Sequence, residues 1–261
     1  MKISKIFLYD EPSIPEIKIK HLADFIRNKF KIDTEVRKNI FSDIQKTTAK
    51  QLASCRITNG IKPFEIHSPT EKEIEYEENN FQSLSKTNNI IMYDGFEFQK
   101  VLQNIVSKEE KTMEYFHLIF TNKLMCTYNY NDYRYHGRAI ICSNPSIISI
   151  TGIIEAPAKP KEYYIDLISN ITHGLNLELI KKKYRGKYLE YNDKRLSSIV
   201  EGYSMQALFY YLTGDPFCNQ KECRLFNPHW QKELLYSQIE IGKLCKKHQK
   251  ILEDLVLDLN S

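Results

Sequence analysis

The chain has 261 residues, of which 42% are hydrophobic and 27% are charged, and these proportions are typical of a soluble globular protein. Its net charge of +4, from 37 basic and 33 acidic residues, is too small for a dedicated DNA-coating protein. The length is sufficient for one large domain or two modest ones.

The N-terminal segment contains one short apolar run, from Ile6 to Tyr9, which cannot form the core of a signal peptide. No stretch approaches the roughly eighteen apolar residues that a membrane-spanning helix requires. We therefore expect a cytoplasmic protein with no membrane partner. In a reducing compartment, six cysteines favour metal ligation over disulfide bonds. Cys55, Cys126 and Cys142 stand apart among apolar neighbours, and we expect them to be small buried side chains.

The first quarter of the chain predicts alternating strands and helices. Residues 3–9 form an apolar run that predicts a strand, and residues 17–30 carry apolar side chains at helical spacing. Residues 34–41 predict a second strand, and a helix capped near Ser42 is expected to run to about Cys55. This order is typical of an α/β layer.

The middle of the chain predicts an irregular segment followed by more strands. Residues 68–90 are acidic in their first half, and we expect a mobile, solvated surface excursion. A short strand at 90–93 and a helix at 95–106 are expected next. Residues 115–121 and 124–130 predict two strands around a turn at Asn122 and Lys123. Two further strands are expected at 138–142 and 147–150.

From residue 161 onward the pattern is helical. A helix at 163–179 is expected to be interrupted at Gly174, and a helix at 194–213 is expected to end at Gly214. Further helices are expected at 230–243 and from about Cys245. Because no repeat or linker divides the chain, we expect one continuous domain. Residues 1–190 would form its α/β portion, and residues 191–261 a helix followed by a zinc-binding subdomain.

Four residues near the C-terminus have the spacing of a closed zinc site. Cys218 and Cys223 form a C-x4-C pair, and Cys245 and His248 form a C-x2-H pair after a longer loop. Two close pairs of soft ligands are the usual way in which a chain surrounds a tetrahedral zinc ion. Four protein ligands leave no open coordination position, so this zinc would be structural. His229 could replace His248, but C-x2-H presents two ligands from one turn.

This C-terminal third resembles the archaemetzincins, a branch of the metzincin zinc peptidases. Their pattern is HExxHxxGxxH followed at once by Cys, then x4, Cys, x, Met and, after a longer loop, C-x2-C. Gly214 takes the position of the glycine, Cys218 and Cys223 match the C-x4-C pair, and Cys245 with His248 takes the final pair. The resemblance implies a metzincin-like α/β fold, with a mixed sheet flanked by helices and a C-terminal subdomain held together by a structural zinc ion.

The chain departs from that pattern at every catalytic position. Ala207, Tyr211 and Phe217 occupy the positions of the three zinc-binding histidines, and Leu208 replaces the catalytic glutamate. Leu225 occupies the methionine position. Ala and Phe cannot ligate zinc, and Leu cannot act as a base. The resemblance therefore implies membership of a group of archaeal proteins described as metallopeptidases, in a chain whose usual catalytic site is lost.

On this alignment the former active-site helix is an apolar core helix. Its expected core residues are Leu196, Ile199, Val200, Tyr203, Ala207, Leu208, Tyr211 and Leu212.

Other polar residues could form a replacement site. His136 and Arg138 belong to a segment rich in tyrosine and arginine, and Glu155 and Lys159 could support acid–base chemistry nearby. The same segment is compatible with peptide binding along a sheet edge, with stacking on nucleic-acid bases, or with an ordinary tyrosine-rich strand. His173, on a mostly apolar helix, is expected to be a satisfied core histidine.

The sequence thus favours a zinc-binding relative of metallopeptidases that binds a peptide or protein without cleaving it. An alternative is an active metal-dependent peptidase or hydrolase that uses a relocated metal. Its ligands would come from His136, Glu155, His173 and His229. A second alternative is a zinc protein that binds nucleic acid.

Overall fold

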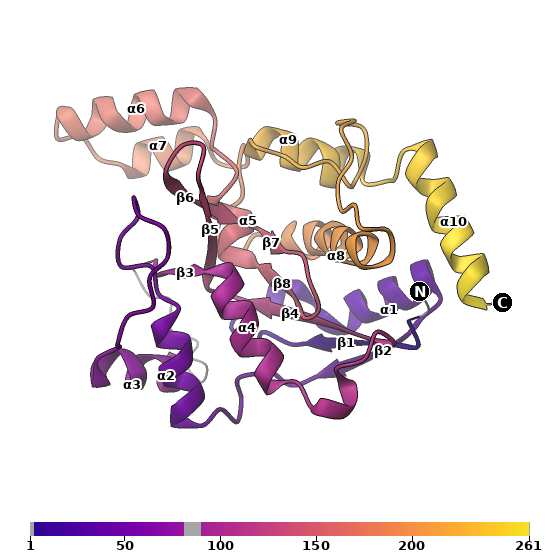
Figure 1. Ribbon diagram of the computed structural model, residues 1–261. Helices are drawn as coiled ribbons and strands as arrows, with labels where there is room; N and C mark the ends of the chain where they lie inside the picture. Colours follow the sequence, from indigo (N-terminus) through magenta and orange to yellow (C-terminus); the bar gives the residue numbers. More distant parts are fainter. Residues whose placement is uncertain (1–2, 81–89, 261) are drawn as a thin grey trace.

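Residues 3–80 and 90–260 are described by the computed structural model, in which a mixed sheet is covered by helices on both faces (Figure 1). Five strands lie in the order β2-β1-β4-β8-β7, and all neighbours are parallel except β7, which is antiparallel to β8. Their bounds are Lys5–Tyr9 (β1), Asp33–Arg37 (β2), Tyr115–Thr121 (β4), Ile140–Ile141 (β7) and Ser146–Ser149 (β8). The expected α/β fold with a mixed, helix-flanked sheet is confirmed.

A second sheet has the order β3-β5-β6, with bounds Met92–Asp94 (β3), Leu124–Asn129 (β5) and Arg134–Arg138 (β6). The two strands predicted on either side of Asn122 and Lys123 are confirmed as β4 and β5, but they belong to different sheets. Both edges of β4 are already occupied, by β1 and β8, so β5 leaves the first sheet and pairs with β3 and β6. Strand β6 was not predicted, because its residues are mostly polar and at least partly exposed and so lack an apolar strand pattern.

Two hydrophobic cores form on the two faces of the larger sheet because side chains alternate along each strand. Ile6 and Leu8 of β1 face one core, which includes helices α1 (Ile19–Phe30) and α8 (Leu196–Thr213). Phe7 and Tyr9 face the other core, which includes α2 (Lys46–Ser54) and α4 (Gly95–Ile105). Both faces of β1 and β4 are therefore covered, as their continuous apolar runs require.

Helix α8 is apolar on almost every side and lies deep in the molecule, as such a helix must. Of the eight residues predicted to form its core face, six are buried, and Tyr211 and Leu212 pack against the same core. The helix ends at Gly214 as predicted. Gly214 has a left-handed backbone (φ 81°), and its amide donates to the Tyr210 carbonyl at 2.7 Å. A residue without Cβ adopts this conformation at little cost.

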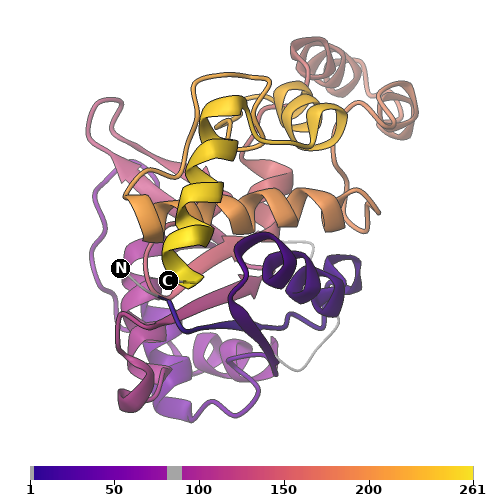
Figure 2. The ribbon, with the colours of Figure 1, turned by 90° about the vertical axis from the view of Figure 1, so that its right-hand side faces the viewer.

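The C-terminal segment contains α9 (Gln231–Leu235), a π-helical turn η3 (Tyr236–Ile241) and α10 (Lys246–Asn260). It contacts α8 and α1, and Figure 2 shows α10 crossing both helices. The single helix expected at 230–243 is thus a short α-helix that continues as a π turn. Leu234 and Leu252 enter the same core as the N-terminal strands, so the larger core contains residues of both portions of the chain.

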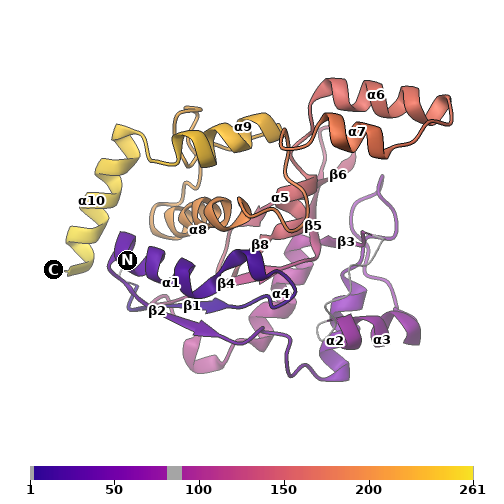
Figure 3. The same ribbon diagram turned by 180° about the vertical axis from the view of Figure 1, so that it is seen from behind.

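After the short helix α5 (Ile150–Glu155), helices α6 (Lys161–Thr172) and α7 (Glu178–Lys183) form a hairpin, here called the α6–α7 hairpin. It lies at one corner of the molecule, away from the larger sheet (Figures 1 and 3). Gly174 interrupts the helical segment as predicted, with φ of 63°. His173 is exposed just after the last residue of α6, so the expectation of a core histidine is wrong. The reason is that this end of α6 points away from the body of the protein (Figure 1).

The acidic segment predicted to be a solvated excursion begins with an ordered helix, α3 (Glu71–Asn80), in which Ile74 and Glu77 are buried. Residues 81–89 lie outside the described residues. The two 3-10 turns are η1 (Pro15–Ile17) and η2 (Lys108–Glu110). Among the described residues, no helix combines the length and the apolar character needed to cross a membrane.

His117, in the middle of β4, predicts a pH effect on stability. The side chain is buried, with Nδ1 3.0 Å from the Tyr9 hydroxyl and Nε2 3.2 Å from the Glu110 carbonyl oxygen. Burial lowers the pKa of His117, although the Glu110 carbonyl and carboxylate oppose this and the Arg37 guanidinium adds to it. As pH falls below about 6.5, the unfolded chain therefore takes up a proton before the folded protein does.

Stability should be insensitive to His117 above that pH and should decline below it, by at most about 1.4 kcal/mol per pH unit. Urea unfolding of wild type and His117→Gln, at pH values on both sides of the histidine pKa, measures the effect. The stability advantage of wild type should shrink at the acidic pH. A difference that stays constant with pH would show that His117 is protonated equally in both states.

Candidate metal centre

The first ligand pair lies on a short loop that follows α8. After the turn at Gly214, the Cys218 amide donates to the Leu225 carbonyl at 2.9 Å, and the Phe226 amide donates to the Cys223 carbonyl at 2.9 Å. These bonds fold residues 218–226 back on themselves, so that both thiols are on one side. The Gln220 amide also points at Cys218 Sγ, at 3.4 Å.

The second pair comes from the start of α10. Cys245 immediately precedes the helix and His248 lies in its first turn, so a C-x2-H spacing places both side chains on one face. The Gln249 amide donates to the Cys245 carbonyl at 2.8 Å, which fixes this turn. The Cys245 amide is 3.4 Å from Cys223 Sγ and so connects the two halves of the cluster.

The ligand atoms of Cys218, Cys223, Cys245 and His248 all lie within 4.8 Å of one another. His248 Nδ1 is 3.2 Å from Cys245 Sγ and 3.7 Å from Cys223 Sγ. Ligands that lie about 2.3 Å from a tetrahedral zinc ion are about 3.8 Å apart, so this spacing fits the ion. Within residues 3–80 and 90–260 this is the one group of three or more His, Cys, Asp or Glu side chains gathered in this way.

The surroundings shift the pKa values of the ligands in different directions: they oppose the thiolate at Cys223 and favour the metal-binding forms of Cys245 and His248. Burial raises the pKa of the Cys223 thiol to about 12. Burial acts in the same direction on Cys245, but hydrogen bonds from the His248 backbone and the other cysteines outweigh it and lower its pKa. Burial, with Lys247 nearby, lowers the pKa of His248 and favours the neutral imidazole that metal ligation requires. Zinc displaces thiol protons when it binds.

The cluster is held from the side of helix α8. The Phe209 ring of α8 meets the His248 ring edge-on, with centroids 5.9 Å apart. The buried Arg224, on the cysteine loop, donates to the Ser198 carbonyl at 2.5 Å and to Glu201 Oε2 at 2.9 Å. Both acceptors belong to α8. Sequence reasoning missed Arg224 and Glu201, because charged residues so far apart in the chain carry no signal of their pairing.

His229, the alternative fourth ligand, is exposed and away from the cluster, and its amide donates to Glu233 Oε2 at 3.2 Å. His248 therefore completes the group of four. Cys55 and Cys126 are buried and Cys142 is half-buried, and burial raises the pKa of each thiol to about 12.

The positions that the resemblance aligns with catalytic residues are occupied by Ala207, Leu208, Tyr211 and Phe217. Ala207 and Leu208 are 0% exposed, within the larger core. The Tyr211 hydroxyl donates to the Met113 carbonyl at 3.0 Å, and its ring packs on Phe116 with centroids 4.9 Å apart. Phe217 is half-buried. Ala207, Leu208 and Phe217 offer neither a zinc ligand nor a base, and Tyr211 alone could not hold the ion.

The residues considered for a replacement site are dispersed. His136 pairs with Asp132, with Nε2 2.7 Å from a carboxylate oxygen. Glu155 lies 3.6 Å from the ammonium group of Lys159. The exposed His173 contacts the Ser169 carbonyl of its own helix. Arg138 donates to the Thr127 hydroxyl across the two strands β5 and β6.

The family match covers nearly the whole chain. The family described as "Probable metallopeptidase family (DUF6775)" matches residues 2–255. The chain therefore belongs to this family, and the membership of a metallopeptidase family that the resemblance implied is confirmed. Among curated proteins, none matches the chain.

Two solved structures are similar to this one. Archaemetzincin from Methanopyrus kandleri is 8% identical, with a TM-score of 0.48, covering 98% of this chain and 96% of that chain. A zinc-dependent peptidase from Methanocorpusculum labreanum is 10% identical, with a TM-score of 0.42, covering 95% of this chain and 98% of that chain.

Proposed function

We propose that this chain is a non-catalytic member of its metallopeptidase family, stabilised by a structural zinc ion, and that it binds a peptide or protein without cleaving it. The observation that carries the proposal is the contrast between two sites on neighbouring segments. Four ligands converge at Cys218, Cys223, Cys245 and His248, whereas the adjacent helix carries buried Ala207 and Leu208 where the archaemetzincin pattern has a ligand and a base.

Zinc at the four-residue cluster would be a structural ion. Three thiolates and one imidazole fill its tetrahedral coordination, so no position remains for water or substrate. The ion would connect the cysteine loop, α8 and α10, because its ligands come from both sides of the C-terminal segment. Without an open position, zinc supplies folding free energy in place of Lewis-acid chemistry.

The best-placed surface for an extended peptide is the outer edge of β6. This strand is the last in its sheet, and its residues are half exposed. Within the described residues, the segment at Gly60 covers part of this edge, where the Tyr135 amide meets the Gly60 carbonyl at 3.4 Å. Tyr130 and Tyr133 are exposed at the turn that leads into β6. Edge strands bind extended peptides through their backbone groups, and rigid aromatic side chains add contact area.

Zinc content and peptide hydrolysis, measured on the same preparation, test the proposal. We expect one zinc per chain by elemental mass spectrometry and no cleavage of unfolded casein above the buffer rate, with or without added zinc. Casein should still bind in a pull-down or by anisotropy. Tyr130→Ser with Tyr133→Ser should weaken that binding by about tenfold, if each ring contributes ~0.7 kcal/mol.

Tyr210→Ser, at a half-exposed tyrosine on α8, is the matched control and should bind normally. A second zinc equivalent with chelator-sensitive casein cleavage would instead support the enzyme with a relocated metal. Strongly salt-dependent binding of RNA or DNA, with no casein binding, would support the nucleic-acid alternative. Either result would contradict the proposed function.

A further inference from the structure

The α6–α7 hairpin exposes aliphatic side chains that a soluble surface rarely gathers in one place. Ile165, Ile168 and Ile171 of α6 are 58%, 64% and 60% exposed, and their spacing places them along one side of the helix. Leu175 and Leu179, at the turn and at the start of α7, are also exposed. These five exposed side chains are here called the aliphatic face of the hairpin; Ile165, the first of them, also lines the groove beside α9. Exposed apolar groups of this extent mark contact sites.

A dense basic segment follows the aliphatic face directly. Five of the seven side chains from 181 to 187 are basic, in the sequence KKKYRGK. Two of the five are neutralised locally, because Lys181 pairs with Glu178 at 2.7 Å and Lys183 pairs with Asp166 at 2.6 Å. Lys182 and Arg185 are exposed and have no ion-pair partner among the described residues. Lys182 and Arg185 therefore give the hairpin a net positive charge about one helical turn after the aliphatic face.

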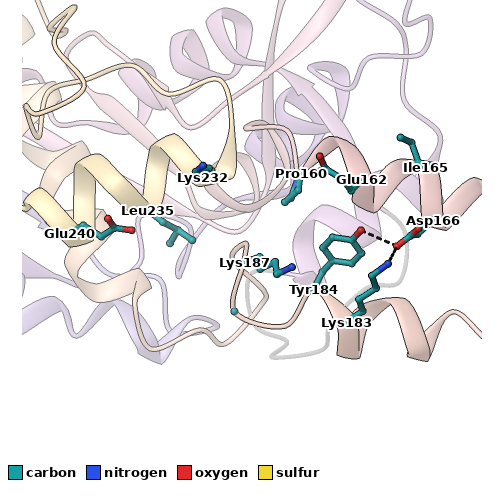
Figure 4. Close-up of a pocket in the computed structure, with 11 residues that line it drawn as sticks. Pro160, Glu162, Ile165, Asp166, Lys183, Tyr184, Lys187, Lys232, Leu235 and Glu240 are labelled. Atoms are coloured by element: carbon teal, nitrogen blue, oxygen red, sulfur yellow. Dashed lines mark hydrogen bonds and ion pairs between the residues drawn. The ribbon is translucent and has the colours of Figure 1, made fainter.

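The hairpin is a built structure with its own small core, formed by Tyr163, Leu167, Ile180, Tyr184 and Tyr188. Figure 4 shows Lys183, the last residue of α7, and the following Tyr184 converging on Asp166 of α6, with the Tyr184 hydroxyl donating to that carboxylate at 2.9 Å. A groove of about 770 Å³ separates the base of the hairpin from α9, and Lys187 and Lys232 line it. Because this small core holds the two helices together, the aliphatic face has a fixed orientation at one corner of the molecule (Figure 1).

The composition of this surface favours a lipid over a protein partner. The centres of protein interfaces are enriched in aromatic residues, Met and Arg, and lysine is depleted there. Apart from Tyr164 of α6, which is 41% exposed, the hairpin surface has the opposite composition, with Ile and Leu at the tip and mostly lysine behind it. Aliphatic side chains that enter the boundary of the acyl chains, with lysines at the level of the headgroups, are the pattern of helices that lie on anionic membranes.

We propose that the α6–α7 hairpin docks this protein on the surface of an anionic lipid membrane. Ile168, Ile171 and Leu175 enter the outer part of the bilayer, and Lys182 and Arg185 contact anionic headgroups. Because the hairpin lies at a corner of the molecule, a flat membrane surface can contact the hairpin without contacting the rest of the protein. Such contact needs no membrane-spanning helix, and it departs from the expectation, drawn from the sequence, that no membrane is a partner.

Co-sedimentation with vesicles tests this proposal on the full chain. Vesicles that contain phosphatidylglycerol should bind the protein, and vesicles of phosphatidylcholine alone should not. Added salt should weaken the binding, because screening reduces the attraction to headgroups. Lys182→Ala with Arg185→Ala should weaken binding on the order of 25-fold, since each basic residue near an anionic surface contributes about fivefold. Ile168→Ser with Ile171→Ser should abolish sedimentation at the same lipid concentration.

Matched controls exist elsewhere on the surface. Ile61→Ser with Ile66→Ser removes two equally exposed isoleucines, and Lys108→Ala with Lys111→Ala removes two exposed lysines; both should bind vesicles normally. Absence of binding to phosphatidylglycerol vesicles, or binding that both hairpin variants retain, would overturn the proposal. A dimer in analytical ultracentrifugation that Ile168→Ser with Ile171→Ser disrupts would assign the aliphatic face to a second copy of the chain. All variants alter exposed side chains, and circular dichroism checks that each one folds.

Discussion

Replacing Cys218 with Ser should remove zinc from the protein and lower its free energy of unfolding by at least about 4 kcal/mol, among the largest effects expected of a single substitution. The ligand atoms of the cluster lie within 4.8 Å of one another and come from two segments that are separated in the chain by α9 and η3. In the unfolded chain those ligands are dispersed, so the binding free energy of zinc adds to the free energy of folding. Elemental mass spectrometry and urea unfolding measure the two effects.

Matched controls separate the loss of a ligand from the loss of a thiol. Cys142→Ser changes a half-buried cysteine outside the cluster and should leave the zinc content unchanged. Cys218→His offers a ligand of a different size and should retain part of the zinc. A chelator that removes zinc should destabilise wild type to the level of Cys218→Ser and leave the variant unaffected. Unchanged zinc content and stability in Cys218→Ser would refute the metal centre.

Local patterns in the sequence predicted much of this region. The C-x4-C and C-x2-H spacings are local, and each pair needs only one loop or one helical turn to bring its side chains together. Gly214 predicted the end of α8 because its backbone conformation is itself a local property. The apolar runs of β1 and β4 likewise predicted buried strands, since buried parallel strands need apolar residues on both faces.

Features that depend on distant partners could not be predicted in this way. Whether β5 pairs with β4 depends on which edges of β4 are already occupied, and β1 and β8 come from opposite ends of the α/β portion. His173 follows an ordinary apolar helical pattern, and nothing local shows that the hairpin turns that pattern toward solvent. Glu201 and Arg224 each predict a solvated charge until the fold brings them together.

Glu77 is the clearest example of this limit. The acidic run around it reads as a solvated face, yet its side chain is 0% exposed. Arg56 and Lys123 reach it from either side, with Arg56 Nε 2.9 Å from Oε1 and Lys123 Nζ 2.7 Å from Oε2. The Tyr93 hydroxyl donates to Oε1 at 2.7 Å. Burial lowers the pKa of Lys123, and the attraction of Glu77 opposes this shift. One carboxylate therefore holds α3 against the segment after α2 and the start of β5.

Glu77→Ala should lower the free energy of unfolding by about 3–5 kcal/mol, because it removes the counter-ion that the buried Lys123 shares with the half-buried Arg56. Glu75→Ala, at an exposed position on the same helix, is the control and should change stability by no more than about 0.5 kcal/mol. Urea unfolding followed by circular dichroism measures both variants.

A double variant identifies the physical cause of that loss. Suppose that Glu77→Ala lowers the free energy of unfolding because it leaves the charge of Lys123 without its counter-ion. Adding Lys123→Met to Glu77→Leu should then recover part of the lost stability. The reason is that apolar groups of similar volume replace a buried ion pair with little penalty. If the cost is only lost packing of α3, the two substitutions should add, because neither depends on the charge of the other. Additive losses would show that the apolar contacts of α3, and not the ion pairs of Glu77, hold this helix in place. A recovery would show that charge pairing decides where this acidic helix lies.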